Sequence, residues 1–132
     1  MVENNSKFID LGFATVKLRD DKIANTNILF EGSATLEQAE KLLEAYIKVT
    51  NGEKTPHLFT MTKLAIMDAK VMEFIVNVAN NHGKADAFVI HSLPQKILGN
   101  IYLKFKSPKI PTRIFSSERK AIIWLNQYKK TP

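Results

Sequence analysis

The chain has 132 residues, of which 45% are hydrophobic, and a formal net charge of +6. This length suits one domain with its own hydrophobic core. There is no cysteine, which excludes disulfides, thiolate metal sites, iron–sulfur clusters and cysteine nucleophiles.

The N-terminal part of the chain predicts a hairpin. The first ten residues or so lack the charged and apolar regions of a signal peptide. We expect them to form a frayed terminus. Phe13–Leu18 alternates apolar and polar residues and predicts a strand. Asp20 and Asp21 indicate a turn, and Ile23–Phe30 predicts a second strand, antiparallel to the first.

The clearest helix follows this hairpin. Thr35 and Gln38 have the spacing of a capping box, in which each residue satisfies a backbone amide of the other. Apolar residues recur at helical spacing behind them, which favours a helix with one buried side. Asn51 and Gly52 tolerate the left-handed conformation that ends helices, so the helix is expected to stop there.

Strands and helices then alternate. His57–Met61 and Ala87–His91 predict strands, and the second is apolar enough to be buried on both faces. Between them, Asp68 is a plausible N-cap for a helix that we expect to end at Gly83.

Two more helices and one strand complete the pattern. Ser92 is expected to cap a helix with Pro94 in its first turn, and a buried stripe is predicted along it at Ile97, Leu98, Ile101 and Phe105. Thr112–Phe115 predicts the last strand, and Ser116 or Ser117 caps the last helix. Its buried stripe is predicted at Ala121, Trp124, Leu125 and Tyr128.

The element order is therefore β-β-α-β-α-β-α-β-α, over one domain spanning residues 1–132. This order predicts an α/β fold with a mixed, mostly parallel sheet of about five strands covered by helices. No stretch approaches the roughly 20 apolar residues of a membrane span, so we expect a cytoplasmic protein.

Two segments resemble a known fold family. Residues 58–74, LFTMTKLAIMDAKVMEF, are similar to the strand, loop and helix start of anti-sigma-factor antagonists with the STAS fold, and of their SpoIIAA-like relatives. Thr60 stands in place of their strand aspartate, and Asp68 in place of the aspartate before their phosphorylated serine. Residues 111–125, PTRIFSSERKAIIWL, resemble the ending of a small family of uncharacterised bacterial proteins with this fold.

The departures from that family are informative. Ala69 occupies the position of the phosphorylated serine, and Lys70 follows it. Alanine has no hydroxyl, so it cannot accept a phosphoryl group and the phosphorylation switch cannot operate there. The resemblance implies a STAS-like interaction module whose partner-binding residues are Thr62, Lys63, Met67, Asp68, Ala69 and Lys70.

No catalytic or metal constellation is predicted. His57, His82 and His91 are expected at different ends of strands and helices, so they do not predict a shared metal site. His91 and Ser92 could join Asp68 in a Ser–His–Asp set, but neighbouring residues on a strand point to opposite faces and no G-x-S-x-G elbow is present. The glycines form no nucleotide-binding pattern either, so no cofactor and no enzymatic activity are expected.

Positive charge accumulates in the second half of the chain. Residues 1–66 carry 8 Lys or Arg and 9 Asp or Glu, whereas residues 67–132 carry 11 and 4. A candidate anion-binding cluster comprises Lys104, Lys106, Lys109 and Arg113, with Lys96 nearby and with Tyr102 and Phe105 interleaved. Solvated lysines explain most such clusters, and nucleic acid is an unlikely partner.

Two functions stay open. The first is the non-enzymatic module for a protein partner, with a homodimer as one option. The alternative is a domain that binds a lipid or small apolar ligand in a pocket at the carboxyl ends of the strands. That pocket would lie beside Met61, Met67 and His91, with a volume of about 300 Å³ or more. Met67 is the best candidate for an exposed apolar contact, since methionine suits adaptable surfaces.

Overall fold

The computed structural model describes residues 7–129. Its strands are β1 (Phe8–Asp10), β2 (Ala14–Leu18), β3 (Ala24–Ile28), β4 (Gly32–Ser33), β5 (Pro56–Met61), β6 (Ala65–Ile66), β7 (Ala85–Val89) and β8 (Thr112–Phe115). Its α-helices are α1 (Leu36–Val49), α2 (Ala69–Asn77), α3 (Leu93–Ile101) and α4 (Glu118–Leu125). Short helical turns follow three of them, namely η1 (Ala79–His82), η2 (Tyr102–Lys106) and η3 (Asn126–Tyr128).

The main sheet has six strands in the order β1-β2-β3-β5-β7-β8. β1, β2 and β3 pair antiparallel, and every later pair is parallel, so the predicted mostly parallel α/β sheet is confirmed. The expected number of about five strands is one too low, because Phe8–Asp10 forms an edge strand in the region that was expected to be a frayed terminus. The rest of that expectation falls on residues 1–6, outside the described residues.

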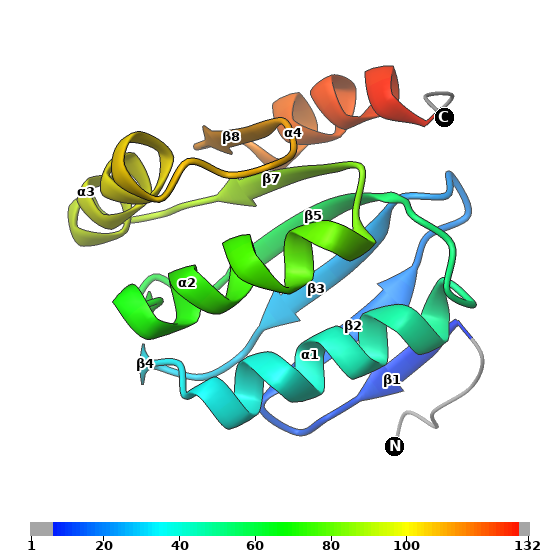
Figure 1. Ribbon diagram of the computed structural model, residues 1–132, viewed down its shortest axis with the longest axis horizontal. Coiled ribbons are helices and arrows are strands. Elements are labelled where there is room, and N and C mark those ends of the chain that lie inside the picture. The colour runs from blue at the N-terminus through cyan, green and yellow to red at the C-terminus, as the bar shows by residue number, and fades with distance from the viewer. Residues whose placement is uncertain (1–6, 130–132) are drawn as a thin grey trace.

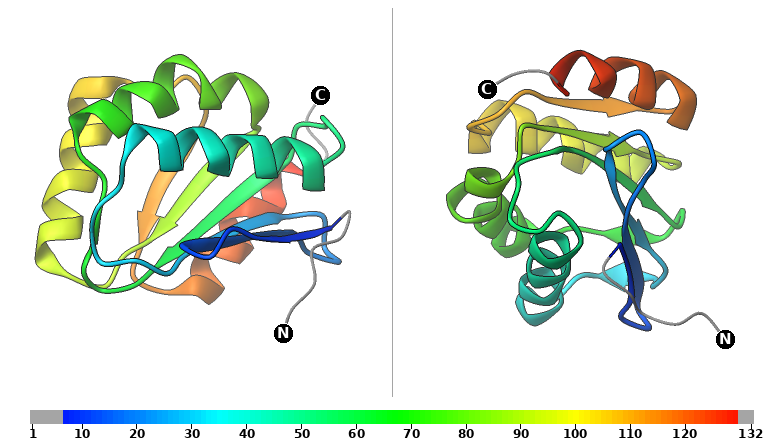
Figure 2. Two further views of the ribbon diagram at one scale, coloured as in Figure 1. Left: turned by 90° about the horizontal axis from the view of Figure 1, so that it is seen from below. Right: turned by 90° about the vertical axis from the view of Figure 1, so that its right-hand side faces the viewer.

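The helices cover the two faces of the sheet unequally. The sheet curves around α1, α2 and α3, whereas α4 lies alone on the outer face (Figure 1, Figure 2). The core under α4 joins Ala121, Trp124 and Leu125 to Leu58 and the alanines of β7. α4 therefore anchors the sheet from one side, while the three other helices enclose the larger core.

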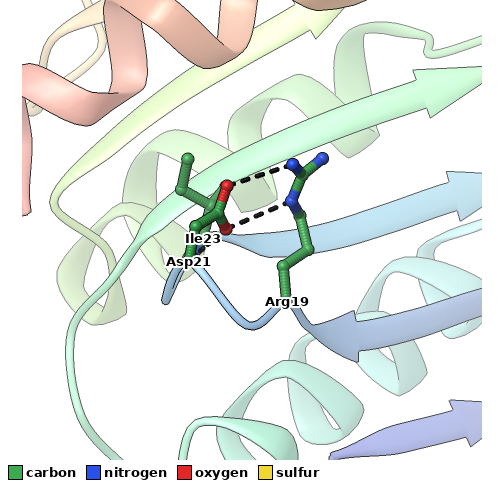
Figure 3. Close-up of polar contacts among 3 residues, drawn as sticks. All are labelled: Arg19, Asp21 and Ile23. Carbon is green, nitrogen blue, oxygen red and sulfur yellow. Dashed lines mark hydrogen bonds and ion pairs between the residues drawn. The ribbon is translucent and has the colours of Figure 1, made fainter.

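The β2–β3 hairpin is closed by a polar turn (Figure 3). Arg19 donates from Nε to Oδ1 of Asp21 at 3.1 Å and from Nη2 to Oδ2 at 3.0 Å. The backbone amide of Ile23 donates to the same Oδ1 at 3.2 Å. Asp21 thus holds both sides of the turn, as its position between two predicted strands indicated.

The predicted helix caps are confirmed. Thr35 and Gln38 form the reciprocal capping box at the start of α1. The side chains of Asp68, Ser92 and Ser117 each accept a backbone amide at the start of α2, α3 and α4. The second helix is shorter than expected, because α2 ends at Asn77 and the chain reaches Gly83 through the 3-10 turn η1.

The predicted buried stripe of α3 is wrong for three of its four residues, while Leu98 packs against the core as predicted. Ile97, Ile101 and Phe105 are exposed, and the helix instead packs on the sheet through Gln95, Leu98 and Tyr102. Residues 95, 98 and 102 also share one face at helical spacing, so the sequence offers a second side that can pack on the sheet. The polar residue on the inner side is Gln95, whose amide group finds hydrogen-bond partners there.

Candidate functional site

An apolar stripe runs along the outer side of α3 and η2. Leu93, Ile97, Ile101 and Phe105 are 68%, 51%, 40% and 69% exposed, and each lies four residues after the one before. Helical residues four apart lie on the same side, so these side chains line up. α3 itself lies at the end of the molecule towards which the parallel strands point (Figure 1).

The stripe is bordered by positive charge. No Asp or Glu occurs in residues 87–117, although this segment carries Lys96, Lys104, Lys106, Lys109 and Arg113. Lys96 and Lys104 are exposed on α3 and η2, and the Nζ atom of Lys104 lies 5.6 Å from the ring centre of Phe105. We call Leu93, Lys96, Ile97, Ile101, Lys104 and Phe105 the α3 face.

The predicted anion-binding cluster is not one patch. Lys106 forms an ion pair with Glu73 of α2 at 3.3 Å. The guanidinium of Arg113 lies 5.9 Å from the ring centre of Trp124 on α4, whereas the next residue, Ile114, packs towards α3 at Gly99. Arg113 therefore lies on the opposite face of the sheet from the lysines of α3 and η2.

Gln95 ties α3 to the loop after β5. Its Nε2 donates to the carbonyl oxygens of Thr62 at 2.8 Å and Ala65 at 2.9 Å, and its Oε1 accepts the amide of His91 at 2.7 Å. The exposed side chains of Lys63 and Leu64 lie in the loop held by these bonds. This loop and the start of α3 are consequently positioned together.

The predicted partner-binding residues of that region have mixed environments. Lys63, Ala69 and Lys70 are exposed. The hydroxyl of Thr62 donates to the carbonyl of Phe30 at 2.8 Å, so Thr62 helps to hold the loop. Asp68 caps α2, accepting the amide of Val71 at 3.2 Å.

Met67 is not the exposed contact that was expected. It packs half-buried against the large core and lines both of the apolar cavities described below. Its flexible side chain serves here as a filler between cavities rather than as an outer contact.

Two of the three residues considered for a Ser–His–Asp set are helix caps. Ser92 and Asp68 accept amides at two different helix starts, and His91 is exposed beside Ser92. Within residues 7–129, no three His, Asp or Glu side chains gather as metal ligands would.

A buried histidine lies under α1. His57 is stacked between Tyr46, 4.7 Å away between ring centres, and Phe59, 3.9 Å away. Its Nε2 is hydrogen-bonded to the Thr26 hydroxyl at 2.6 Å. Burial lowers the pKa of His57 to about 3, so the ring is neutral at physiological pH.

A buried carboxyl lies beside it. Asp86 pairs with His57 in the register of β5 and β7 and is 5% exposed. Its Oδ2 accepts one long hydrogen bond, from Nδ2 of Asn80 at 3.4 Å. Burial raises the pKa of Asp86 to about 7. Burial, together with the negative charge of Asp86, also raises the pKa of Tyr102, whose buried hydroxyl has no hydrogen-bond partner among residues 7–129.

Two small cavities flank α2. One of about 50 Å³ lies between α2 and α3 and is lined by Met61, Met67 and Tyr102 among others. The other, of about 60 Å³, lies between α1 and α2 above His57 and Asp86. The first is much smaller than the expected pocket of about 300 Å³, and His91 does not line it.

Sequence reasoning missed His57 and Asp86 as a pair. One signal was available, since Asp86 is a carboxylate inside the otherwise apolar strand ADAFV. A fully buried strand rarely carries an unpaired carboxylate. The pairing with His57 depends on the register of β5 with β7, which local patterns do not specify.

Comparison with known proteins supports the fold and names a family. Among residues 7–129, no helix is long and apolar enough to cross a membrane. No match was found among curated proteins. The fold is similar to the crystal structure of an uncharacterized protein of the DUF3478 family with a SpoIIAA-like fold from Shewanella loihica PV-4. The TM-score is 0.55 at 16% identity, over 95% of this chain and 98% of that chain.

The predicted SpoIIAA-like fold is thus confirmed, and at this identity the likeness concerns the fold alone. The family model that matches the sequence covers residues 17–129, almost the whole of the described structure. The chain belongs to the family described as Domain of unknown function (DUF7793).

Proposed function

We propose that this protein is a non-enzymatic, STAS-like interaction module of one domain, which binds an acidic amphipathic helix of a partner protein on its α3 face. The observation that supports this most directly is the line of four exposed apolar side chains along α3 and η2. The proposal places the protein in the cytoplasm, in keeping with its lack of cysteine.

Burial of the apolar stripe would drive binding. Fully burying one Leu, Ile or Phe side chain contributes about 1.5–3 kcal/mol. A contiguous row of such side chains on one helix marks an interaction surface, whereas single exposed ones do not. Ile123 on α4 is 56% exposed but lies outside any such row. It therefore provides a matched control.

Charge favours an acidic partner. Lys96 and Lys104 border the stripe, and no carboxylate in residues 87–117 neutralises them. Two copies docked through this face would bring like charges together, which counts against a homodimer. A partner helix with a leucine-rich side edged by Glu would match both the four-residue spacing and the charge.

A protein is preferred to an anionic membrane because of the resemblance to anti-sigma-factor antagonists, which act by binding proteins. Lys63, in the loop that Gln95 joins to α3, and Lys70, in the first turn of α2, would extend the same basic rim. Ala69 has no hydroxyl, so phosphorylation at that position would not regulate the contact.

Lipid binding is a weaker alternative. The cavity of about 50 Å³ near the carboxyl ends of the strands is far smaller than the pockets that hold drug-sized ligands. An acyl chain would need α2 or α3 to move away from the core.

The experiment uses a labelled synthetic helix of about 20 residues, with Leu on one side and Glu along both edges. Fluorescence anisotropy should show binding that weakens with added salt. A scrambled peptide and a Lys-edged twin should not bind. Saturable binding to anionic vesicles in place of the peptide, or self-association of the protein, would overturn the assignment to an acidic protein partner.

A further inference from the structure

The cavity between α1 and α2 has a polar floor and apolar walls. His57 and Asp86 are register partners on neighbouring strands, so their side chains lie side by side on the face under the two helices. The walls include Leu42, Leu43 and Phe74, which are half-buried. The cavity therefore leads from the surface between the helices to two ionisable groups in the core.

The floor carries hydrogen-bond acceptors that have few donors among the described residues. Apart from the 3.4 Å hydrogen bond from Asn80 to Oδ2, the described residues offer the carboxyl group of Asp86 no hydrogen bond and no ion pair. The described residues also give the imidazole ring of His57 no hydrogen bond other than that of its Nε2 to Thr26. A carboxylate removed from water needs a cation or several donors, because an isolated buried charge is costly.

We propose that this cavity binds the ammonium head of a small primary amine, with Asp86 as the counter-ion and the stacked rings of Tyr46, His57 and Phe59 beside it. An ammonium group donates three hydrogen bonds, and its positive charge supplies the partner that the carboxylate of Asp86 lacks. This site does not depend on the α3 face and is independent of the proposed interaction.

The size of the cavity limits the ligand. Its volume of about 60 Å³ is well below the roughly 150 Å³ of a cavity that admits benzene. The buried part is therefore an ammonium with one or two carbons. The remaining carbons of the amine would lie along the apolar rim at Leu42 and Phe74.

Binding of the amine is coupled to loss of a proton. Burial raises the pKa of Asp86 to about 7, so in the free protein the carboxyl keeps its proton up to near-neutral pH. An adjacent ammonium favours the ionised carboxylate and lowers this pKa. Below pH 7, each amine bound should therefore release up to one proton to the buffer.

The test is isothermal titration calorimetry with n-propylammonium, n-propanol and propionate. We expect propylammonium to bind, with a heat at pH 6 that varies with the ionisation enthalpy of the buffer. Propanol and propionate should give no saturable signal. Absence of binding by propylammonium, or equal binding by propanol, would overturn the proposal in favour of a cavity that holds only water.

Variants separate the site from general destabilisation. Asp86→Asn, a nearly isosteric change, should weaken propylammonium binding by about 10- to 100-fold and abolish proton release. Ala39→Met should block binding by filling the cavity without touching Asp86, since Ala39 is one of its walls. Asp20→Asn removes an exposed carboxylate and should leave binding unchanged. Full binding by both cavity variants would contradict the assignment.

Discussion

At the scale of single residues, burial moves two neighbouring groups in opposite directions. It lowers the pKa of His57 to about 3 and raises the pKa of Asp86 to about 7. Both side chains are therefore neutral in the free protein over most of the acidic range. Keeping both neutral lowers the stability of the fold between about pH 4 and 6.5, because in the unfolded chain both groups are charged over that range.

The pH dependence of stability should reveal Asp86. In the unfolded chain its carboxyl ionises near pH 4, whereas in the folded protein it holds its proton to about pH 7. Between these values the folded state binds more protons, so the contribution of Asp86 to stability falls as pH rises. From pH 4 to 7, the unfolding free energy of Asp86→Asn should therefore rise relative to that of the wild type by on the order of 4 kcal/mol, as measured by denaturant unfolding.

His57 acts in the other direction. Its unfolded form takes up a proton below about pH 6.5, while the folded form stays neutral to about pH 3. Its contribution to stability is thus present above pH 6.5 and is lost as pH falls, so it opposes the trend from Asp86 in the wild type. Asp86→Asn and the wild type both contain His57, so its contribution cancels in the difference between their unfolding free energies. A difference as flat as that of the control Asp20→Asn would contradict the account of Asp86.

For single residues, prediction from the sequence succeeded where a side chain contacts a residue close to it in the chain. Thr35, Asp68 and Ser92 cap helices as predicted, because each accepts an amide three residues away. His57 and Asp86 could not be paired in this way, since their contact requires the register of two strands about 30 residues apart in the chain.

At the scale of elements, the start of α1 depends on its capping box. Thr35→Ala would leave the amide of Gln38 without its acceptor. Chemical denaturation should show a loss of about 1 kcal/mol in unfolding free energy. The exposed Ser33, two residues earlier, provides the control. A loss as large for Ser33→Ala would mean that the effect does not come from the cap.

α3 shows why an amphipathic pattern can be assigned to the wrong side. Its outer row is more apolar than its inner row, so hydrophobicity alone favoured burial of the outer one. The inner row carries Gln95, which is buried because three backbone groups of the neighbouring loop and strand end need partners. Only the tertiary structure supplies those partners.

Gln95 should therefore be essential for holding the loop after β5. Gln95→Leu would leave the buried carbonyl of Ala65 without its donor, and an unsatisfied buried acceptor costs about 1–3 kcal/mol. The amide of His91 would also lose its acceptor and should exchange faster with deuterium. Asn100→Leu, an exposed change on the same helix, should affect neither measurement. Unchanged exchange at His91 would show that Gln95 does not hold this region.

At the scale of the whole molecule, alternation of strands and helices was sufficient to predict the mostly parallel α/β sheet, and the resemblance of residues 58–74 and 111–125 implied the SpoIIAA-like fold. The edge strand β1 was missed because three residues carry too weak a pattern. Trp124 and Leu125 were placed correctly in the core beneath α4. The proposed interaction surface was not found from the sequence, because three of its apolar residues, Ile97, Ile101 and Phe105, were assigned to the core.

Stability and binding should separate across the two kinds of apolar side chain. Leu125 is fully buried, and Leu125→Ala should cost about 2–5 kcal/mol in unfolding free energy. Ile97→Ser combined with Phe105→Ser changes exposed positions and should cost no more than about 1 kcal/mol in unfolding free energy. A large loss in the double variant would mean that α3 needs these side chains for folding.

The most direct test of the interaction proposal compares two variants in their affinity for the Glu-edged amphipathic peptide. Ile97→Ser with Phe105→Ser alters the α3 face, and Ile123→Ser alters an equally exposed isoleucine on α4. The account predicts that fluorescence anisotropy will show the first variant losing at least about tenfold in affinity, as expected when two apolar anchors are removed. The second variant should bind like the wild type. Equal affinity of both variants would contradict the account.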